Sequence, residues 1–338
     1  MRERPELPDA TILEALRAQY GVVGAAVSFL PCGNDSATSV YRVEAVDGSV
    51  YFLKARGRGR FSLRSLEVPN YLRSLGLSHL LAPISTKTGE LQNNIGDYTL
   101  SLYPYVQGKV GADAGMTDQH WRDFGGLVRR VHTCELPSRL RQMLPRECFV
   151  PQQWEVLSRL QTVMRQSELR NPWEREFAGF WQSQQQVIDL VVQRAAALGD
   201  RLRQADAPLV LCHADMHVWN VLIDDAQQLW LVDWDETMLA LKERDLMFVV
   251  GGIGNRLDPR ATECFLRGYG ECTIDPVALA YYRFAWAAQD MAANGEQVLL
   301  LDDLSADTKQ RALSSFVDLF APGSIVSLAL GSDYPGRL

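Results

Sequence analysis

Hydrophobic and polar residues follow two different rhythms along this chain of 338 residues. Residues 9–19 space their apolar side chains at helical intervals behind Asp9, a good helix-capping residue, and so predict an opening helix. From residue 27 to residue 53, short runs rich in β-branched residues are separated by turns. They predict three antiparallel strands, the last two joined by a hairpin at Asp47-Gly48.

The following segment completes a small first lobe. Helical spacing returns over residues 61–75, and residues 81–106 predict two further strands around a turn. The pattern therefore predicts a five-stranded antiparallel sheet with one inserted helix, and we place this N-terminal lobe at residues 1–106.

From residue 117 onward most apolar residues recur at intervals of three and four, which predicts amphipathic helices. The exception is residues 208–233, where short apolar runs separated by turns predict strands. We therefore expect an α+β protein of two lobes, in which residues 107–338 form a large, mainly helical C-terminal lobe.

Composition narrows the class of protein. The chain is 47% apolar and 22% charged, which is typical of a globular protein. It has no long uncharged apolar run, and residues 1–10 do not have the apolar core expected of a signal peptide. The six cysteines are scattered without a CxxC pair, which argues against a zinc knuckle or a disulfide framework. The formal net charge of -7 argues against a nucleic-acid partner. We expect a cytoplasmic protein with no membrane partner.

The densest chemical signal lies in the predicted β-rich segment. His213, Asp215 and Asn220 hold the H-x-D-x-x-x-x-N spacing of protein kinases, and Asp233 ends a nearby apolar run. Phosphoryl transfer needs a carboxylate to accept the proton of the attacking hydroxyl, the role predicted for Asp215 as the catalytic residue. It also needs oxygen ligands for Mg²⁺, the role predicted for Asn220 and Asp233. Two alternatives stay open: a purely structural cluster, and a metal-hydrolase set in which His217 joins His213 and Asp215.

A kinase also needs a cation for the nucleotide phosphates. Lys54 ends the third predicted strand, and Glu67 lies in the helix that follows, where a carboxylate partner is expected. The alternative for Lys54 is a surface lysine at a strand end. Nearby, Arg56 belongs to an arginine and glycine run that we expect to be an exposed loop.

Two further segments are candidates for nucleotide binding. Gly33 and Ser36 lie between the first two strands, where a phosphate-covering loop is expected, although a plain hairpin would look similar. Tyr103 and Tyr105 follow the fifth strand, where the backbone would meet the adenine edge. Pro104 lacks an N–H group, so the hydrogen bonds should fall on its neighbours.

Together these residues resemble the aminoglycoside phosphotransferase family and its relatives, the choline and homoserine kinases. The likeness rests on HADMHVWN at 213–220 and VDWDE at 232–236, and it runs over nearly the whole chain. Residues 242–248 and 33–36 look most like the spectinomycin phosphotransferases. The pattern departs at Ala214, where the family more often has glycine or serine, and at Trp219, which is often glycine.

The resemblance implies a protein-kinase-like fold that uses ATP and Mg²⁺, with GTP left open as the nucleotide. It makes Asp215 the base, and Asn220 and Asp233 the Mg²⁺ ligands. It also implies that Lys54 binds phosphate with Glu67, and that Asp245 braces the catalytic loop. Fold and reaction follow from such a likeness more safely than the substrate does.

The substrate is expected to be a small hydroxylated cation. Candidate contacts are acidic or aromatic: Asp235, Glu236, Tyr282, Trp286 and Asp290. The last three are four residues apart and share one helix face, and aromatic rings beside carboxylates suit an amino-sugar or aminocyclitol cation. The alternative is an aromatic stripe that packs in the core, with Asp290 at its solvent-exposed end.

Three functions are therefore compared. The first is phosphorylation of spectinomycin or a similar aminocyclitol or aminoglycoside antibiotic. The second is phosphorylation of a metabolite such as choline, homoserine or a sugar. The third is a non-catalytic nucleotide-binding protein, against which the intact set of Lys54, Asp215, Asn220 and Asp233 counts.

Overall fold

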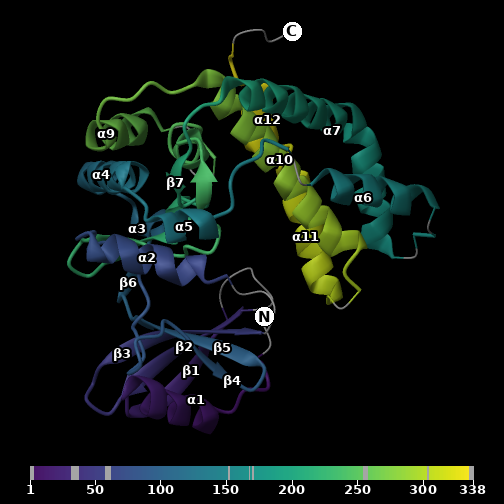
Figure 1. Ribbon diagram of the computed structural model, residues 1–338. Helices are drawn as coiled ribbons and strands as arrows, with labels where there is room; N and C mark the ends of the chain where they lie inside the picture. The colour runs from purple at the N-terminus through teal and green to yellow at the C-terminus, as the bar shows by residue number, and fades with distance from the viewer. Residues whose placement is uncertain are drawn as a thin grey trace. The chain divides into compact units, whose positions relative to one another are not determined.

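The computed structural model describes residues 4–31, 38–57, 62–150, 153–166, 168–169, 171–253, 258–302 and 304–334 (Figure 1). The chain divides into two compact units. The first consists of Met1–Pro145 and Val218–Thr237, and the second of Arg146–His217 and Met238–Leu338. The lobe boundary expected at residue 106 stays a prediction.

The first unit is built on a five-stranded sheet in the order β1-β2-β3-β5-β4, with every neighbouring pair antiparallel. The strands are β1 (Gly24–Leu30), β2 (Thr38–Ala45), β3 (Val50–Gly57), β4 (Asn93–Ile95) and β5 (Tyr98–Pro104). Asp47 accepts the Ser49 N–H in the expected hairpin, and Gly48 takes the positive φ of 85° that its turn requires. The five-stranded antiparallel sheet is confirmed.

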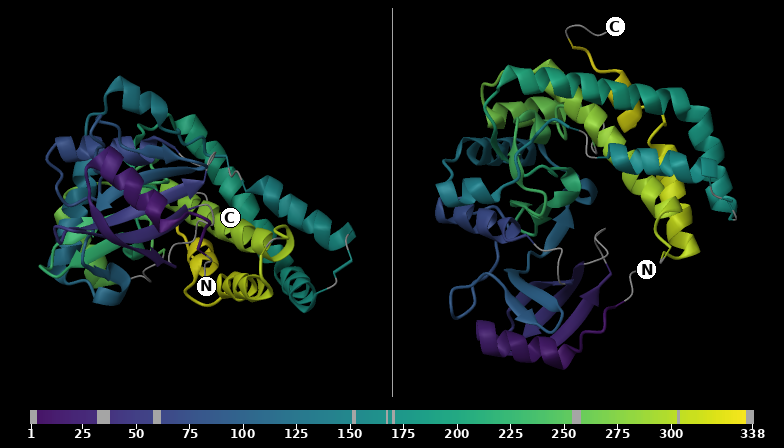
Figure 2. Two further views of the ribbon diagram at one scale, coloured as in Figure 1. Left: turned by 90° about the horizontal axis from the view of Figure 1, so that it is seen from below. Right: turned by 45° about the vertical axis from the view of Figure 1, so that its right-hand side comes forward.

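The two faces of this sheet differ in character. Tyr41, Val43 and Leu53 are fully buried on one face, against helix α1 (Asp9–Ala15) and the π-helical turn η1 (Leu16–Tyr20). Figures 1 and 2 show α1 lying across this face. Because side chains alternate along a strand, the opposite face of β3 carries its cationic residues.

Residues 81–85 differ from expectation. They run alongside the sheet without forming a strand, and only the Ile84 N–H donates to a β5 residue, the Leu102 carbonyl. Pro83 has no N–H to donate, which interrupts a ladder at this point. The inserted helix is confirmed as α2 (Arg64–Ser74).

The rest of the first unit consists of helices and a small sheet. The helices are α3 (Gly111–Ala114), α4 (Asp118–Thr133) and α5 (Ser138–Met143). The sheet has the order β6-β8-β9, from β6 (Gly108–Val110), β8 (Val221–Asp224) and β9 (Leu229–Leu231). The short 3-10 helix η2 (Val218–Asn220) leads into β8. Of the expected metal ligands, Asn220 ends η2 and Asp233 lies two residues after β9.

The second unit is mainly helical. Its helices are α6 (Trp154–Gln166), α7 (Pro172–Ala205), α8 (Glu243–Leu246), α9 (Pro259–Tyr269), α10 (Pro276–Leu299), α11 (Ala306–Asp318) and α12 (Ile325–Leu330). Strands β7 (Val210–Cys212) and β10 (Met238–Ala240) form an antiparallel pair. The α+β class is confirmed.

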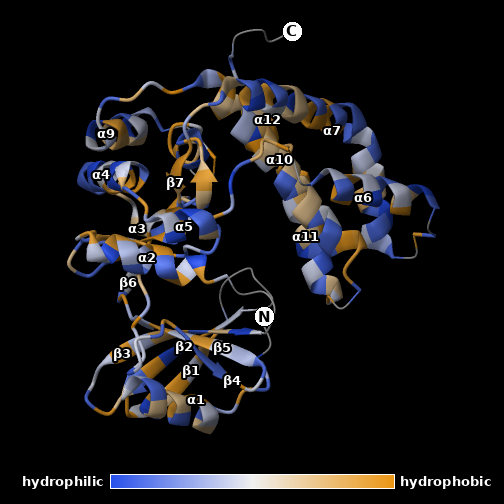
Figure 3. Ribbon diagram, in the orientation of Figure 1, coloured by the Kyte–Doolittle hydropathy of each residue, from blue (hydrophilic) through white to orange (hydrophobic). Residues whose placement is uncertain are grey.

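Helix α10 is the centre of this unit. It packs against α6, α7, α11 and α12, and Figure 3 shows hydrophobic and hydrophilic positions interleaved along these helices. Its N-terminus is capped by Asp275, whose carboxylate accepts the Val277 and Ala278 N–H groups. Among the helices that the structure describes, none is both long enough and apolar enough to cross a lipid bilayer.

Candidate active site

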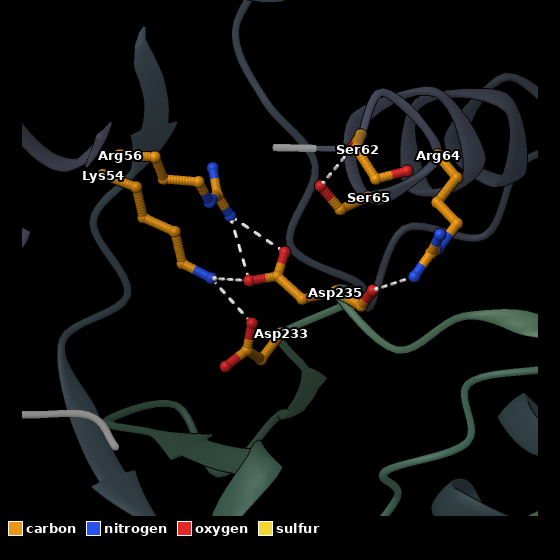
Figure 4. A network of polar contacts seen from close by, with 7 residues as sticks. All are labelled: Lys54, Arg56, Ser62, Arg64, Ser65, Asp233 and Asp235. Carbon is orange, nitrogen blue, oxygen red and sulfur yellow. Dashed lines mark hydrogen bonds and ion pairs between the residues drawn. The ribbon is translucent and has the colours of Figure 1, made fainter. Parts of the chain in front are cut away.

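The first unit gathers two cations and two carboxylates (Figure 4). Lys54 and Arg56, two residues apart on β3, point from the same face of the sheet. The Lys54 ammonium lies 2.7 Å from Asp233 and 3.6 Å from Asp235. The Arg56 guanidinium donates to both carboxylate oxygens of Asp235, at 2.9 and 3.1 Å. The four charges thus balance within one connected cluster.

Local backbone bonds fix the acidic side of this cluster. The Val232 N–H donates to the Asn220 carbonyl at 2.9 Å, which ties the residue before Asp233 to the end of η2. Asp233 itself has a φ of 66°, a left-handed conformation that few residues other than glycine adopt. Such a conformation persists where its surroundings hold it, and it is common at functional sites.

Asn220 and Asp233 fit a divalent cation. A carboxylate and an amide supply oxygen atoms, the ligands that Mg²⁺ prefers. The Asp233 side chain is 44% exposed and already faces a cation, the Lys54 ammonium. Asn220 and Asp233 belong to the same compact unit, so both oxygen donors come from one part of the fold.

The charge cluster also shifts the pKa values of Lys54 and Asp235. Burial favours the neutral form of Lys54, yet attraction to Asp233 and Asp235 raises the pKa of Lys54 above its usual value. Burial likewise opposes the ionised form of Asp235, but Lys54 and Arg56 hold the pKa of Asp235 down to about 2. Lys54 and Asp235 are therefore both charged at neutral pH.

Two expectations about this region are wrong. The Glu67 carboxylate binds Arg139 at 2.6 Å, whereas Lys54 binds Asp233 and Asp235, so the expected Lys54–Glu67 pair is not formed. Arg56 is only 4% exposed and lies on β3. It is a buried ion-pair partner rather than part of an exposed loop.

The acidic residues expected to contact substrate are placed differently as well. Asp235 is engaged by Lys54 and Arg56, two cations of β3, and is not left available to a cationic substrate. Glu236 is exposed in the turn that follows, while Trp234 beside them is buried. The charge of Asp235 is thus already neutralised within the first unit.

Tyr103 and Tyr105 lie at the end of β5, as expected. Tyr103 is buried; this burial, more than the opposing effect of Lys54 and Arg56, raises the pKa of its hydroxyl. The Tyr105 N–H donates to the Val50 carbonyl at 3.3 Å, so the sheet uses this donor. Gly33 and Ser36 lie outside the residues that the structure describes.

In the second unit, Asp245 braces the loop that holds Asp215. Its fully buried carboxylate accepts the His213 N–H at 2.9 Å and the Ala214 N–H at 2.7 Å. Ala214 has a φ of 68°, and the carboxylate stabilises this left-handed turn. The turn presents Asp215 next to β7.

Asp215 also contacts two histidines. Its carboxylate lies 3.3 Å from His217 Nε2, and its N–H donates to His213 Nδ1. His213 is fully buried, with a ring nitrogen engaged by the loop backbone. This engagement does not favour the metal-hydrolase alternative for these residues.

Asp290 on α10 faces the same region. Burial, followed by repulsion from Asp215, raises the pKa of Asp290 to about 7, while Trp286, His217 and Arg244 act in the opposite direction. A carboxyl group that titrates near neutrality beside a second carboxylate is typical of a functional site. Asp215 and Asp290 therefore share one electrostatic environment within the second unit.

The two aromatic candidates behave differently from each other. Tyr282 is fully buried, and its hydroxyl accepts the Leu241 N–H at 3.3 Å, which favours the alternative of an aromatic residue in the core. Trp286 is partly buried, with the Arg244 guanidinium 4.9 Å from the centre of its ring. A cation–π contact is thus already made by the chain itself.

Sequence reasoning missed Arg56 and Arg244. Arg56 could have been found from its two-residue spacing to Lys54, because alternate strand residues share a face. Arg244 gave no such signal, since its stacking on Trp286 depends on the packing of α8 against α10.

Comparison with known proteins shows the family to which the chain belongs. A family model described as the phosphotransferase enzyme family matches residues 28–286. The chain belongs to this family. It is thus a small-molecule phosphotransferase, or kinase, as its motifs predict.

Solved structures extend the likeness to nearly the whole length of this chain. Spectinomycin phosphotransferase APH(9)-Ia in complex with ADP and spectinomycin is 26% identical, with a TM-score of 0.87, and 97% of this chain and 99% of that chain are covered. Amicoumacin kinase, in complex with AMP-PNP and Ca²⁺, is 20% identical, with a TM-score of 0.62 over 95% and 97% of the two chains. Choline kinase from Streptococcus pneumoniae is 15% identical, with a TM-score of 0.56 over 92% and 99%. The protein-kinase-like fold is confirmed, and the last two comparisons bear on fold alone.

The brace on the Asp215 loop can be tested by substitution. We expect Asp245→Ala to lower the free energy of unfolding by about 2 to 5 kcal/mol, because two buried N–H groups lose their charged acceptor. We also expect kcat to fall at least ~10-fold, because the loop that presents Asp215 loses its support. Denaturant unfolding and steady-state kinetics measure the two effects.

The matched control is Asp275→Ala. This aspartate also accepts two backbone N–H groups, but at the start of α10, and losing such a cap costs about 1 kcal/mol. Its kcat should be unchanged while the variant is folded. Equal losses of kcat in both variants would show that Asp245 acts only on general stability.

The raised pKa of Asp290 predicts that the stability of the folded protein depends on pH. The folded-state pKa of about 7 exceeds the ordinary aspartate pKa of 3.8, so the folded protein binds the proton more tightly and loses stability as pH rises through this window. Asp290→Asn cannot ionise. We expect its Tm, relative to wild type, to rise between about pH 4 and pH 8 by at least ~2 °C. A difference that stays constant across this range would contradict the expectation.

Proposed function

We propose that this phosphotransferase transfers the γ-phosphate of ATP to a hydroxyl group of an aminocyclitol antibiotic, with spectinomycin as the specific candidate. The observation that carries the proposal is the likeness to spectinomycin phosphotransferase, at a TM-score of 0.87 over nearly the full length of both chains. At 26% identity this supports a shared reaction and points to the substrate class.

The chain's own residues support direct phosphoryl transfer. In this proposal Asp215 accepts the proton of the attacking hydroxyl on its carboxylate, and His217 Nε2, 3.3 Å away, helps to orient that carboxylate. Lys54 binds the nucleotide phosphates. Asn220 and Asp233 hold Mg²⁺, which neutralises phosphate charge when bound. GTP stays an alternative nucleotide.

A cationic substrate suits the two neighbouring carboxyl groups of the second unit, Asp215 and Asp290. Asp215 and Asp290 interact electrostatically there, and the pKa of Asp290 is raised because its ionised form lacks sufficient compensation. A positively charged ammonium group beside Asp290 would stabilise that ionised form. The proposal therefore assigns Asp290 to the substrate's cationic group and leaves Trp286 as the aromatic wall, with its Arg244 partner.

This assignment predicts a pH dependence of substrate binding. Because the ionised form of Asp290 binds a cation, KM for spectinomycin should fall as pH rises through about 7, the pKa of Asp290. In Asp290→Asn the KM should be higher, and its change across this range should be reduced at least ~3-fold relative to wild type. Initial rates between about pH 6 and pH 8 measure both. An unaltered KM profile in the variant would remove Asp290 from the substrate site.

The proposed reaction is tested with a substrate panel. Purified protein is incubated with ATP, Mg²⁺ and, separately, spectinomycin, other aminoglycosides, choline or a sugar, and ADP release is followed. We expect spectinomycin-dependent turnover that falls by about 10²- to 10⁴-fold in Asp215→Asn, because the proton acceptor is lost.

The outcomes separate the candidate functions. Turnover with choline or a sugar instead would keep the kinase chemistry and reject the antibiotic substrate. Nucleotide binding without turnover on any panel member would contradict the proposed transfer and favour a non-catalytic nucleotide-binding protein. The Asp215→Asn variant also serves as the control for contaminating ATPase activity.

A further inference from the structure

The phosphate-binding lysine has a different carboxylate partner from the one its motif suggests. Glu67 on α2 is turned to Arg139, at 2.6 Å. Lys54 instead faces the segment after β9, with Asp233 at 2.7 Å and Asp235 at 3.6 Å. The question is which of these two carboxylates positions Lys54 when nucleotide binds.

Asp233 is poorly suited to that task. Its side chain is 44% exposed, and it is one of the two residues proposed to hold Mg²⁺. A metal ion and the Lys54 ammonium would compete for the same carboxylate. Asp233 is therefore not a lasting partner for Lys54.

Asp235 is held from several sides. Arg56 Nη2 donates to both oxygens of its carboxylate, at 2.9 and 3.1 Å, and these charge-assisted contacts hold the carboxylate in place. Arg64, at the start of α2, donates to its backbone carbonyl at 3.3 Å. Figure 4 shows the carboxylate facing Lys54 and Arg56 on one side, with α2 on the other. Strand β3, helix α2 and the segment after β9 thus meet at Asp235.

Arg56 makes this arrangement costly to break. It is 4% exposed, so its charge needs a nearby carboxylate, and Asp235 supplies one. Lys54 projects from the same face of β3, so the carboxylate that neutralises Arg56 also lies next to the Lys54 ammonium.

We propose that Asp235, fixed by Arg56, is the residue that positions Lys54 for the nucleotide phosphates, in the place expected for Glu67. The inference rests on the proposed role of Lys54 in nucleotide binding. Asp235 is a positioning residue here, because it acts through Lys54 and does not itself touch the phosphates.

The test measures ADP affinity by calorimetry with Mg²⁺ present, so that the metal competes with Lys54 for Asp233, and without a second substrate. We expect Asp235→Asn to weaken ADP binding ~10-fold, because Lys54 loses its fixed position. The sign is informative: removing a negative charge would by itself strengthen the binding of an anionic nucleotide. Asp235→Glu should recover part of the affinity.

A double-mutant cycle tests whether the effect passes through Lys54. In a Lys54→Met background, Asp235→Asn should change ADP affinity less than ~2-fold, because the group it positions is gone. The matched control is Glu67→Gln, which makes the same change from acid to amide on the carboxylate that pairs with Arg139. It should alter ADP affinity less than ~2-fold.

Three results would overturn the proposal: unchanged or tighter ADP binding in Asp235→Asn, an equal loss in the Lys54→Met background, or a larger loss in Glu67→Gln. Thermal unfolding checks that each variant is folded. If Asp235→Asn does not fold, Arg56→Lys takes its place. It keeps the charge on a shorter side chain that loses the contacts made by Arg56 Nη2, so a ~3-fold loss that depends on Lys54 is expected, and no loss would refute the idea. Failure of the wild-type protein to bind ADP would instead contradict the proposed function itself.

Discussion

The organisation of the first unit depends on neutralising two cations on one face of β3. Lys54 and Arg56 project from the same side of the strand, and Arg56 is almost completely buried. An isolated buried charge is costly, so carboxylates must approach this face. Asp233 and Asp235 do so from a segment almost 180 residues further along the chain. The ion pairs therefore bring the expected metal ligand and the expected phosphate-binding lysine together.

Backbone strain marks the same functional segments. Ala214 and Asp233 both have left-handed φ values, of 68° and 66°. Ala214 precedes Asp215, the expected catalytic residue, and Asp233 is itself an expected metal ligand. In the Ala214 turn the compensation is visible, because the Asp245 carboxylate accepts two consecutive N–H groups. Asp233 follows Val232, whose N–H is bonded to the Asn220 carbonyl. Conformations of this kind are retained where neighbouring bonds over-determine them.

Much of the fold was predictable because its determinants are local. The Asp47-Gly48 turn and the alternation along β2 and β3 specify antiparallel pairing, and the sheet forms as expected. Residues 81–85 were misassigned, because an apolar run does not reveal whether its N–H groups find partners. In the candidate site, motif spacing singles out Asp215, Asn220, Asp233 and Lys54, whose roles stay predictions. It did not locate the pairing of Glu67 with Arg139 or of Asp235 with Arg56, because the partners of long charged side chains are decided by tertiary packing. The burial of Tyr282 was likewise hidden, since a helical aromatic stripe looks the same in a core and at a pocket wall.

The central claim is direct transfer of the nucleotide's γ-phosphate to a hydroxyl of an aminocyclitol. Mass spectrometry of spectinomycin after incubation with the protein, Mg²⁺ and ATP carrying ¹⁸O in the γ-phosphate tests it most directly. The account predicts spectinomycin that has gained one labelled phosphoryl group. Unmodified spectinomycin alongside labelled inorganic phosphate would contradict it.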